Sequence, residues 1–491
     1  MERQYEAEER RQLRDIADKW EYTEDEAMQN NALKALADYT KLFLSRMKNP
    51  EIQSSKREHW PSATSNRGNE VNGTSEISIP HRFNPSIQFQ NEGSRQTKRL
   101  ESIMQIGNDP LRLEELIRVF DQHVVRSGSC DIELSVLRWV NDIIGYPEQA
   151  RGCTVSGTSM GAIVAFSTAR HVKLADSSQF RRSVVYMTDL AHFSHTRALR
   201  VVGLADVIVR HVPTVKYRMD SRKLEKQIME DREAGLYPFM VVGTVGTTGL
   251  GTIDPLGDIS EVAQKHGLWF HVDAAIGGCL MLDEAVKKRC EGINMSDSVA
   301  LDFHKSLSAP YGSAAVLVRD GKLLKWAMAR DSAPFISDST DEDGYSPTDF
   351  GFELTRPFRA FPVWFMLKSL GTEMIKTALR EKVRLTKYAF KSIRDMADVV
   401  TCTEPDLTVI AFRYFQPGSE DGNDVTRKWH ELIAKEGQVC MTPTTADGLF
   451  YIRLCILSFR SHIEDVDIAL SAIRRNLDVI LREKDIFVTR L

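Results

Sequence analysis

No stretch of the sequence approaches the roughly 18 consecutive apolar residues that a membrane-spanning helix requires. The N-terminus, MERQYEAEERRQLRD, is charged where a secretory signal peptide would carry an apolar segment. Neither sign of charge is in large excess, because 64 Lys and Arg residues oppose 68 Asp and Glu residues and give a net charge of −4. A protein with this balance is not expected to have nucleic acid or a membrane as a partner.

Cysteine is scarce as well, with seven residues among 491 and no CxxC pair. An odd number of scattered cysteines argues against a disulfide framework and against a zinc site, so no metal site is expected. We therefore expect a reducing compartment and predict a cytoplasmic protein. The remaining composition, 42% hydrophobic and 27% charged residues, is typical of a soluble enzyme with a large core and two or three structural units.

The first 92 residues differ in pattern from the rest of the chain. Residues 1–48 predict an amphipathic helical arm, because their apolar residues recur near the helical period. Residues 49–92 are polar, rich in Ser, Asn and Pro, and without periodicity, which predicts a long loop. We assign residues 1–92 to this arm and loop, 93–360 to a large α/β domain, and 361–491 to a linking helix and a small C-terminal α+β domain.

Between residue 117 and about residue 360, short apolar runs alternate with helical segments, which predicts a mostly parallel sheet with helices on both faces. Strands are expected at 182–188, 205–212, 239–244, 268–272 and 313–319. A helix should begin after Asp220, a good N-cap, and stop at Gly235. The C-terminal part predicts a long helix over 363–393, strands near 409–414 and 449–454, and a helix over 466–481.

The segment from Gly152 to Gly161, GCTVSGTSMG, precedes a helical stretch. Small and hydroxyl residues that open a helix favour an anion site, because the first-turn amides have no partner within the helix. Thr158 and Ser159 are the natural donors to a phosphate. The segment GTSMG also matches the G-x-S-x-G nucleophile elbow of serine hydrolases, with Ser159 as nucleophile, and a plain helix cap without a ligand is the third interpretation.

Two further segments carry chemically useful side chains. Asp273 ends a predicted strand in HVDAA, where a carboxylate would face the crevice in which open α/β sheets bind ligands, although it could merely cap the next helix. Lys305 follows His304 between apolar residues in LDFHKS. A solvated surface lysine is the ordinary interpretation, but a desolvated lysine has a lowered pKa and becomes a nucleophile that can form a Schiff base.

A phosphate cradle, a strand-end carboxylate and a lysine are together what an enzyme of pyridoxal 5'-phosphate (PLP) needs. With these motifs in this order, the sequence resembles the group II PLP-dependent amino acid decarboxylases, the family of aromatic amino acid, glutamate and cysteine sulfinate decarboxylases. The matching blocks are SGTS, HVDAA, the DxHK segment, TDLAHFS at 188–194 and GTVGTTG at 243–249. The resemblance is good from about residue 150 to 318, moderate after that, and weak before residue 115.

The resemblance implies fold type I, the aspartate aminotransferase-like α/β fold, with a large, mostly parallel, seven-stranded sheet domain and a small α+β domain. It also implies roles for the matching residues. Lys305 would carry the cofactor as an internal aldimine, Asp273 would pair with the pyridinium nitrogen, and His192 would stack on the ring and assist protonation. The other cofactor contacts would come from Ala275 (the opposite ring face), Thr158, Ser159 and His304 (the phosphate), and Thr248 (the ring's 3-oxygen or the substrate carboxylate).

The implied reaction is decarboxylation of an L-amino acid to an amine and CO₂, through the Lys305 aldimine and a quinonoid intermediate. In this family a loop tyrosine protonates the substrate's α-carbon, but here the equivalent segment, DSAPFI, has Phe335. Tyr345 or His192 could supply that proton. Otherwise the enzyme could catalyse decarboxylation-coupled oxidative deamination and form an aldehyde, as relatives with this exchange do.

The resemblance also implies a homodimer with the active site at the subunit interface, because fold type I enzymes build their sites between two subunits. The arm over residues 1–48 is a plausible element for exchange between them. Arg356 and Arg359 could neutralise an acidic substrate or anchor a helix. The sequence does not indicate which amino acid is consumed.

Overall fold

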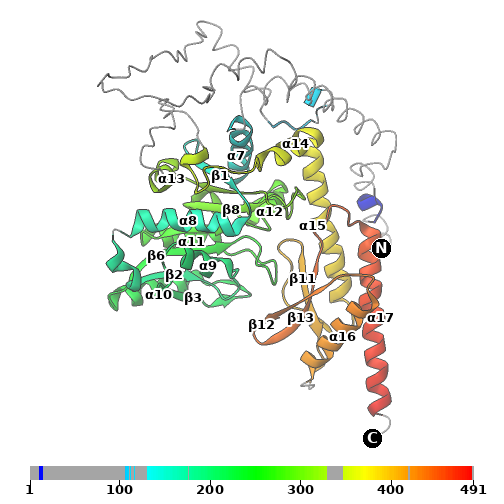
Figure 1. Cartoon of the computed structure of the whole chain (residues 1–491). Coiled ribbons are helices and arrows are strands. Elements are labelled where there is room, and N and C mark those ends of the chain that lie inside the picture. Colours follow the sequence, from blue (N-terminus) through cyan, green and yellow to red (C-terminus); the bar gives the residue numbers. More distant parts are fainter. Residues whose placement is uncertain are drawn as a thin grey trace, which may run out of the picture. The chain divides into compact units, whose positions relative to one another are not determined.

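The computed structural model describes residues 10–14, 106–109, 111, 115–116, 130–174, 176–328, 347–417 and 421–488. The chain divides into two compact units, of which the first comprises Met1–Glu21, Ile106–Leu111 and Ser127–Leu491. All the helices and strands labelled in Figure 1 belong to this first unit. The predicted arm, apart from residues 10–14, and the predicted loop over 49–92 lie outside the described residues, so the boundary at residue 92 stays a prediction.

A seven-stranded sheet forms the centre of the first half of this unit (Figure 1). In order across the sheet, the strands are β1 (Arg151–Val155), β9 (Ala314–Val318), β8 (Ser298–Asp302), β7 (Trp269–Asp273), β6 (Tyr237–Thr244), β2 (Ser183–Met187) and β3 (Ile208–His211). Within the sheet only β9 runs antiparallel to its neighbours. The predicted fold class, a mostly parallel seven-stranded sheet, is confirmed.

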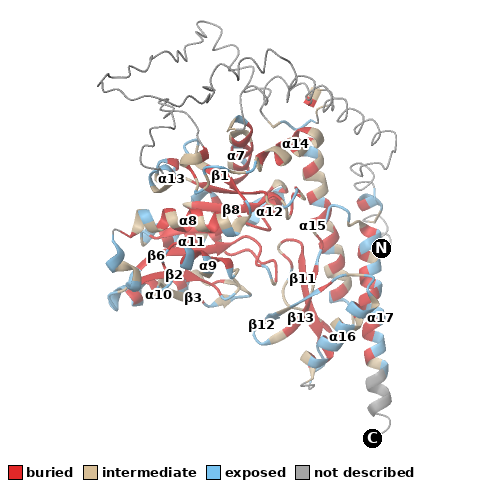
Figure 2. Cartoon of the chain, viewed as in Figure 1, coloured by how far each residue is buried: buried red, intermediate tan, exposed pale blue. Residues whose placement is uncertain are grey.

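The strands of this sheet are short and apolar because helices cover them. Every residue of β2, β7, β8 and β9 is buried, and Figure 2 shows the sheet as a buried layer between helices with exposed outer surfaces. The helices are α7 (Cys130–Ile144), α8 (Thr158–Lys173), α9 (Ser194–Val201), α10 (Ser221–Glu233), α11 (Leu256–Lys265), α12 (Glu284–Arg289) and α13 (Gly321–Met328). Shorter elements are the β4 (Thr214–Val215) and β5 (Arg218–Met219) pair and 3-10 turns at Ser177–Arg182, Cys279–Leu282, Ile293–Met295 and Pro347–Asp349.

The pattern of apolar runs locates most of these elements. The predicted strands correspond to β2, β3, β6, β7 and β9, and α10 is capped as predicted, since the Asp220 carboxylate accepts the amides of Arg222 and Lys223. Strands β1 and β8 escape this pattern, because their sequences RGCTV and SVALD mix polar with apolar residues. No helix in the described part of the chain has the length and apolar character that crossing a bilayer requires.

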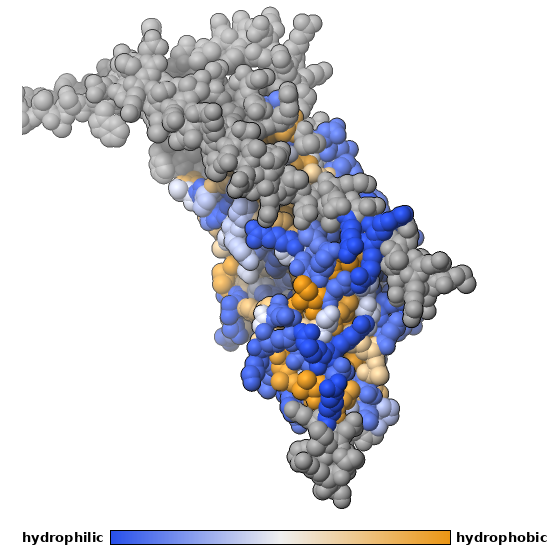
Figure 3. All heavy atoms as spheres, turned by 90° about the vertical axis from the view of Figure 1, so that its right-hand side faces the viewer, coloured by the Kyte–Doolittle hydropathy of each residue, from blue (hydrophilic) through white to orange (hydrophobic). Residues whose placement is uncertain are grey.

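A second, antiparallel sheet lies in the C-terminal part, as predicted. Its strands, in order, are β10 (Val399–Thr401), β11 (Val409–Tyr414), β13 (Leu449–Cys455) and β12 (Thr442–Ala446). The helices α15 (Thr372–Arg394), α16 (Gly422–Glu436) and α17 (Ile463–Val488) share a core with this sheet that includes Phe412 and Trp429. On the face that α17 presents in Figure 3, hydrophilic side chains predominate and hydrophobic areas lie between them.

The predicted single helix over residues 363–393 is wrong. The structure has two helices there, α14 (Ala360–Leu370) and α15, which meet at Gly371. Gly371 has φ 72° and ψ 152°, a conformation that interrupts a right-handed helix and that glycine adopts without steric cost. The apolar period continues across this glycine, so the periodicity alone does not reveal the break.

Candidate active site

Three segments with candidate residues meet at one edge of the large sheet. Asp273 is the last residue of β7, and Asp302 is the last residue of the neighbouring parallel strand β8. Helix α8 begins at the same place, because the Asp302 carboxylate accepts a hydrogen bond from the Thr158 amide at 2.8 Å. Open α/β sheets bind ligands at the carboxyl ends of their parallel strands, so this edge is the candidate active site.

Asp273 is a buried carboxylate with two fixed partners. Its Oδ1 atom accepts the Ala275 amide at 3.0 Å, and its Oδ2 atom lies 3.0 Å from Nε2 of His195. Burial by itself would raise the pKa of Asp273, but the hydrogen bonds from His195 and from the Ala275 amide outweigh burial and hold that pKa below its ordinary value. The carboxylate therefore stays ionised at neutral pH.

Lys305 lies beside a second buried carboxylate. Its Nζ atom is 3.0 Å from Oδ2 of Asp302, and 38% of its side chain is exposed. The same carboxylate accepts from both the amide and the hydroxyl of Thr158, the latter at 3.2 Å. Asp302 thus joins the lysine to the start of α8, and the lysine side chain remains partly exposed.

The N-cap residue of helix α8 provides no side-chain acceptor for the amides of the first turn. The N-cap position is Gly157, which has no side chain to accept a hydrogen bond, and Ser159 in the first turn is exposed. The helix lies tightly against the sheet because Gly161 has no side chain: a Cβ atom there would be 3.0 Å from Cβ of Ala300 in β8. Hydroxyls and amides at a helix N-terminus suit an anion such as a phosphate.

His192 lies in the loop before α9, close enough to the Asp273 carboxylate for its charge to act on the ring. Its Nδ1 atom accepts the Ser194 amide at 3.2 Å and lies 2.8 Å from the Ser194 hydroxyl, so the neutral ring carries its proton on Nε2. Burial lowers the pKa of His192 below its ordinary value, although the charge of Asp273 acts in the opposite sense. His192 is therefore neutral at pH 7 and keeps one N–H to donate.

The three remaining predicted residues lie in different surroundings. His304 donates from Nδ1 to the Ser313 carbonyl at 3.0 Å, and its Nε2 atom is 3.8 Å from the Asp302 carboxylate. Ala275 is buried two residues after Asp273, and its amide donates to that carboxylate. Thr248 is exposed in a turn after β6. The cofactor contacts expected of these residues stay predictions.

The sequence analysis assigns no role to two residues of this site. Asp302 is three residues before Lys305, and His195 is three residues after His192, at the start of α9. Asp302 contacts Lys305 within one segment, but its contact with Thr158, and that of His195 with Asp273, form only because strands and helices distant in sequence converge here. Phe335 and Tyr345, the alternative loop positions for a proton donor, lie outside the described residues.

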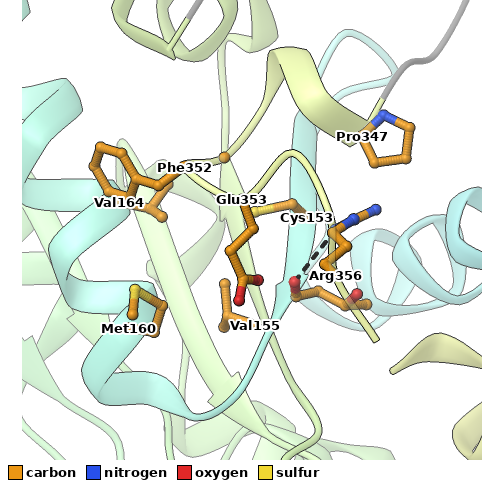
Figure 4. Close-up of a pocket in the computed structure, with 10 residues that line it drawn as sticks. Cys153, Val155, Met160, Val164, Pro347, Phe352, Glu353 and Arg356 are labelled. Carbon is orange, nitrogen blue, oxygen red and sulfur yellow. Dashed lines mark hydrogen bonds between the residues drawn. The ribbon is translucent and has the colours of Figure 1, made fainter. Parts of the chain in front are cut away.

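Arg356 and Arg359 are bound within the chain. Arg356 pairs with Glu133 of α7 and donates to the Thr154 carbonyl at 3.4 Å, beside the small pocket drawn in Figure 4. Arg359 makes two hydrogen bonds to Glu353, at 2.6 and 2.9 Å. These contacts fit the anchoring role better than the neutralisation of a substrate.

Comparison with known proteins identifies relatives of the whole site-bearing region. The sequence profile of the pyridoxal-dependent decarboxylase conserved domain matches residues 126–415. The aromatic-L-amino-acid decarboxylase of Bacillus atrophaeus is 31% identical over 349 residues, covering 70% of this chain and 72% of that protein. The acidic amino acid decarboxylase GADL1 of Xenopus tropicalis is 30% identical over 362 residues, covering 70% of this chain and 71% of that protein.

Solved structures share the fold. The 4-hydroxyphenylacetaldehyde synthase of Rhodiola rosea superposes with a TM-score of 0.65 at 21% identity, covering 80% of this chain and 81% of that chain. The likeness confirms that the architecture is the fold type I architecture of these enzymes.

Proposed function

The chain belongs to the pyridoxal-dependent decarboxylase family, and from that premise we propose that it is a carboxy-lyase that releases CO₂ from an L-amino acid and leaves the amine. The observation that carries the proposal is the convergence of Lys305, the ionised Asp273 and the start of α8 at one edge of the sheet. A lysine amine, a carboxylate and an anion site are the three groups that PLP requires of a protein.

The side chains at this edge fit the cofactor. The Lys305 side chain is partly exposed, and the Asp273 carboxylate keeps its charge although it is buried. The amides and hydroxyls that begin α8 suit a phosphate. The residues that we expect to hold the cofactor are Lys305 at its aldehyde carbon, Asp273 at the ring nitrogen, His192 and Ala275 at the ring faces, Thr158, Ser159 and His304 at the phosphate, and Thr248 near the 3-oxygen or the substrate.

When bound, PLP supplies an electron sink for the charge that remains on the α-carbon as CO₂ leaves. The chain's own residues make that sink effective. Asp273 provides a fixed negative charge that favours a proton on the ring nitrogen, and its two hydrogen bonds leave it no freedom to turn away. His192, neutral and with its proton on Nε2, can hold or deliver a proton near the ring.

Asp302 should oppose cofactor binding. Its carboxylate pairs with Lys305 and occupies the Thr158 amide, and these are the groups that the cofactor's aldehyde and phosphate need. Replacing the charge by a neutral amide of the same size, Asp302→Asn, should therefore tighten PLP binding up to about tenfold, since a charge at a partly buried helix N-terminus contributes up to about 2 kcal/mol. Titration of the cofactor-free protein with PLP, followed by absorbance, measures the dissociation constant. Unchanged or weaker binding by Asp302→Asn would show that the carboxylate does not compete.

The test of the activity is an assay of CO₂ release from each proteinogenic L-amino acid by protein loaded with PLP. We expect one substrate or a small related group to give CO₂ and amine in equal amounts. A protein that binds PLP but releases CO₂ from none of them would contradict the proposal. The relatives named above act on aromatic and on acidic amino acids, so both groups belong in the first set.

Formation of an aldehyde is the second candidate function. It is favoured by Phe335, which cannot donate a proton, and the same fold occurs in an aldehyde synthase. In that reaction the amino acid, O₂ and water give the aldehyde, CO₂, ammonia and hydrogen peroxide. Ser159 also matches a hydrolase motif, but we propose that it serves the phosphate, because it stands at the start of α8 beside Thr158.

Replacement of Phe335 distinguishes the two candidate reactions by their products. Phe335→Tyr should raise the ratio of amine to aldehyde about tenfold or more, because a phenol can protonate the α-carbon before oxygen reacts. Amine, aldehyde and peroxide are measured together for the wild type and the variant. If the wild type already gives only amine, Tyr345→Phe should lower the rate of amine formation. If neither variant changes the rate or the ratio of amine to aldehyde, then neither position supplies the proton.

We further propose that the protein is a cytoplasmic homodimer with the active site at the subunit interface. The family supports this assembly, and the molar mass in solution by light scattering tests it. A monomer that is fully active at low concentration would contradict it.

A further inference from the structure

Two buried histidines behind Asp273 have one unused nitrogen each. His195 places Nε2 on the Asp273 carboxylate, and its Nδ1 atom is buried without a hydrogen-bond partner among the described residues. His271, two residues before Asp273 in β7, is fully buried, and its Nε2 atom likewise has no partner in the described part of the chain. Buried polar atoms without partners are rare in folded proteins, so two of them side by side call for an explanation.

The hydrogen bonds of Ser298 favour one position for the proton of His271. The Ser298 hydroxyl oxygen accepts from Nε1 of Trp269 at 2.9 Å, because an indole nitrogen can only donate. The same hydroxyl lies 2.9 Å from Nδ1 of His271 and can donate its proton there. Burial lowers the pKa of His271 to about 3, so the ring is neutral. A neutral ring that accepts at Nδ1 carries its proton on Nε2, and the unused atom of His271 is a donor.

The unused atom of His195 is the matching acceptor. A neutral His195 that donates from Nε2 to the Asp273 carboxylate has a lone pair on Nδ1. The centroids of the two imidazole rings are 6.1 Å apart, with an angle of 73° between the ring planes. Phe166 of α8 packs against both rings and excludes other polar partners on its side. No direct hydrogen bond joins the donor of His271 to the acceptor of His195, and one buried water between the two rings would satisfy both atoms.

We propose that Ser298, His271 and His195 form one oriented hydrogen-bond chain that ends on Asp273, and that His195 is the positioning residue that holds this carboxylate charged and in place for the cofactor's ring nitrogen. The inference rests on the proposed function, since Asp273 must face that nitrogen. In this chain the hydroxyl of Ser298 donates to His271, His271 donates through one water to His195, and His195 donates to the carboxylate. A carboxylate held in this way cannot rotate or take up a proton without breaking the chain.

The first test concerns the ring protons and needs no activity. Long-range proton–nitrogen spectra of the holoenzyme, labelled with ¹⁵N in histidine, report which ring nitrogen of each histidine is protonated. We expect both His195 and His271 as neutral rings with the proton on Nε2. An imidazolium at His195, or a proton on Nδ1 of either ring, would overturn the chain.

The second test concerns the cofactor. His195→Leu removes the donor to Asp273 and keeps an apolar side chain against Phe166, whereas His195→Gln keeps an amide donor of similar reach. With ¹⁵N-labelled PLP, the ring-nitrogen resonance of His195→Leu should move from the pyridinium position toward neutral pyridine. His195→Gln should restore most of the shift, and kcat should fall about 10- to 100-fold only in His195→Leu.

The outcomes distinguish a failure of the proposed hydrogen-bond chain from a failure of the proposed function. A wild-type ring nitrogen that is protonated, and stays so in His195→Leu, would overturn the role of His195 while leaving the decarboxylase intact. Loss of the pyridinium signal in His195→Leu supports that role even if no amino acid tested releases CO₂. If His195→Leu does not fold, His195→Gln and Ser298→Ala still test the chain. Ser298→Ala should leave the His271 proton on Nε2, because His195 still accepts it there through the water, and a proton that moves to Nδ1 would overturn the chain.

Discussion

Replacement of Lys305 by alanine is expected to lower kcat/KM for CO₂ release at least about 1,000-fold, because the lysine amine is the nucleophile to which the cofactor binds covalently. The substitution removes a half-exposed side chain beside Asp302, so the fold should survive. Activity is measured with saturating PLP in the buffer, so that weaker cofactor binding alone does not cause the loss.

A matched control for this variant is Lys265→Ala, in α11. Lys265 is exposed and pairs with Glu225 at 2.7 Å on the surface, away from the strand ends that carry Asp273 and Asp302. Its replacement should leave the rate unchanged, since exposed ion pairs contribute at most about 1 kcal/mol to stability. Full activity of Lys305→Ala beside a normal Lys265→Ala would show that another residue holds the cofactor.

Replacement of Asp273 by asparagine is expected to lower kcat about 100- to 1,000-fold with little loss of stability. The amide has nearly the same shape as the carboxylate and can still accept the Ala275 amide, but it carries no charge. Without that charge the ring nitrogen loses its proton, and the electron sink weakens. Initial rates of CO₂ release, compared at equal cofactor occupancy, measure the effect.

Asp297→Asn is the control for the loss of a partly buried carboxylate. Asp297 immediately precedes β8 at the opposite end of that strand from Asp302, and it accepts the Phe270 amide at 2.7 Å. An asparagine can accept the same hydrogen bond, so this variant should keep its rate. Equal losses in Asp297→Asn and Asp273→Asn would mean that the sheet tolerates no change of charge, and the catalytic role of Asp273 would not be supported.

The local sequence pattern predicts the elements of this fold well where each element is decided by its own residues. The apolar run that became β7 and the N-cap of α10 at Asp220 are examples, since burial and capping act within a few residues. The pattern fails at Gly371, where a single glycine with positive φ divides a continuous amphipathic period into α14 and α15. The short strand β8 is missed because its sequence, SVALD, mixes polar with apolar residues.

The candidate site divides in the same way. Lys305, Asp273 and Thr158 are predicted from motifs whose chemistry is local, and the structure brings all three segments to one edge of the sheet. The contacts between distant segments are not predictable. Asp302 bonds to Thr158, and His195 bonds to Asp273, only after strands and helices pack. Tertiary contacts of this kind leave no periodicity in the sequence.

The measurement that tests the central claim most directly is reduction of the PLP-loaded protein with borohydride, followed by peptide mapping by mass spectrometry. Borohydride fixes the cofactor to the amine that holds it. We expect the mass of the cofactor on the peptide that contains Lys305 and on no other lysine. A cofactor fixed to a different lysine, or none fixed to a protein that has bound PLP, would contradict the account.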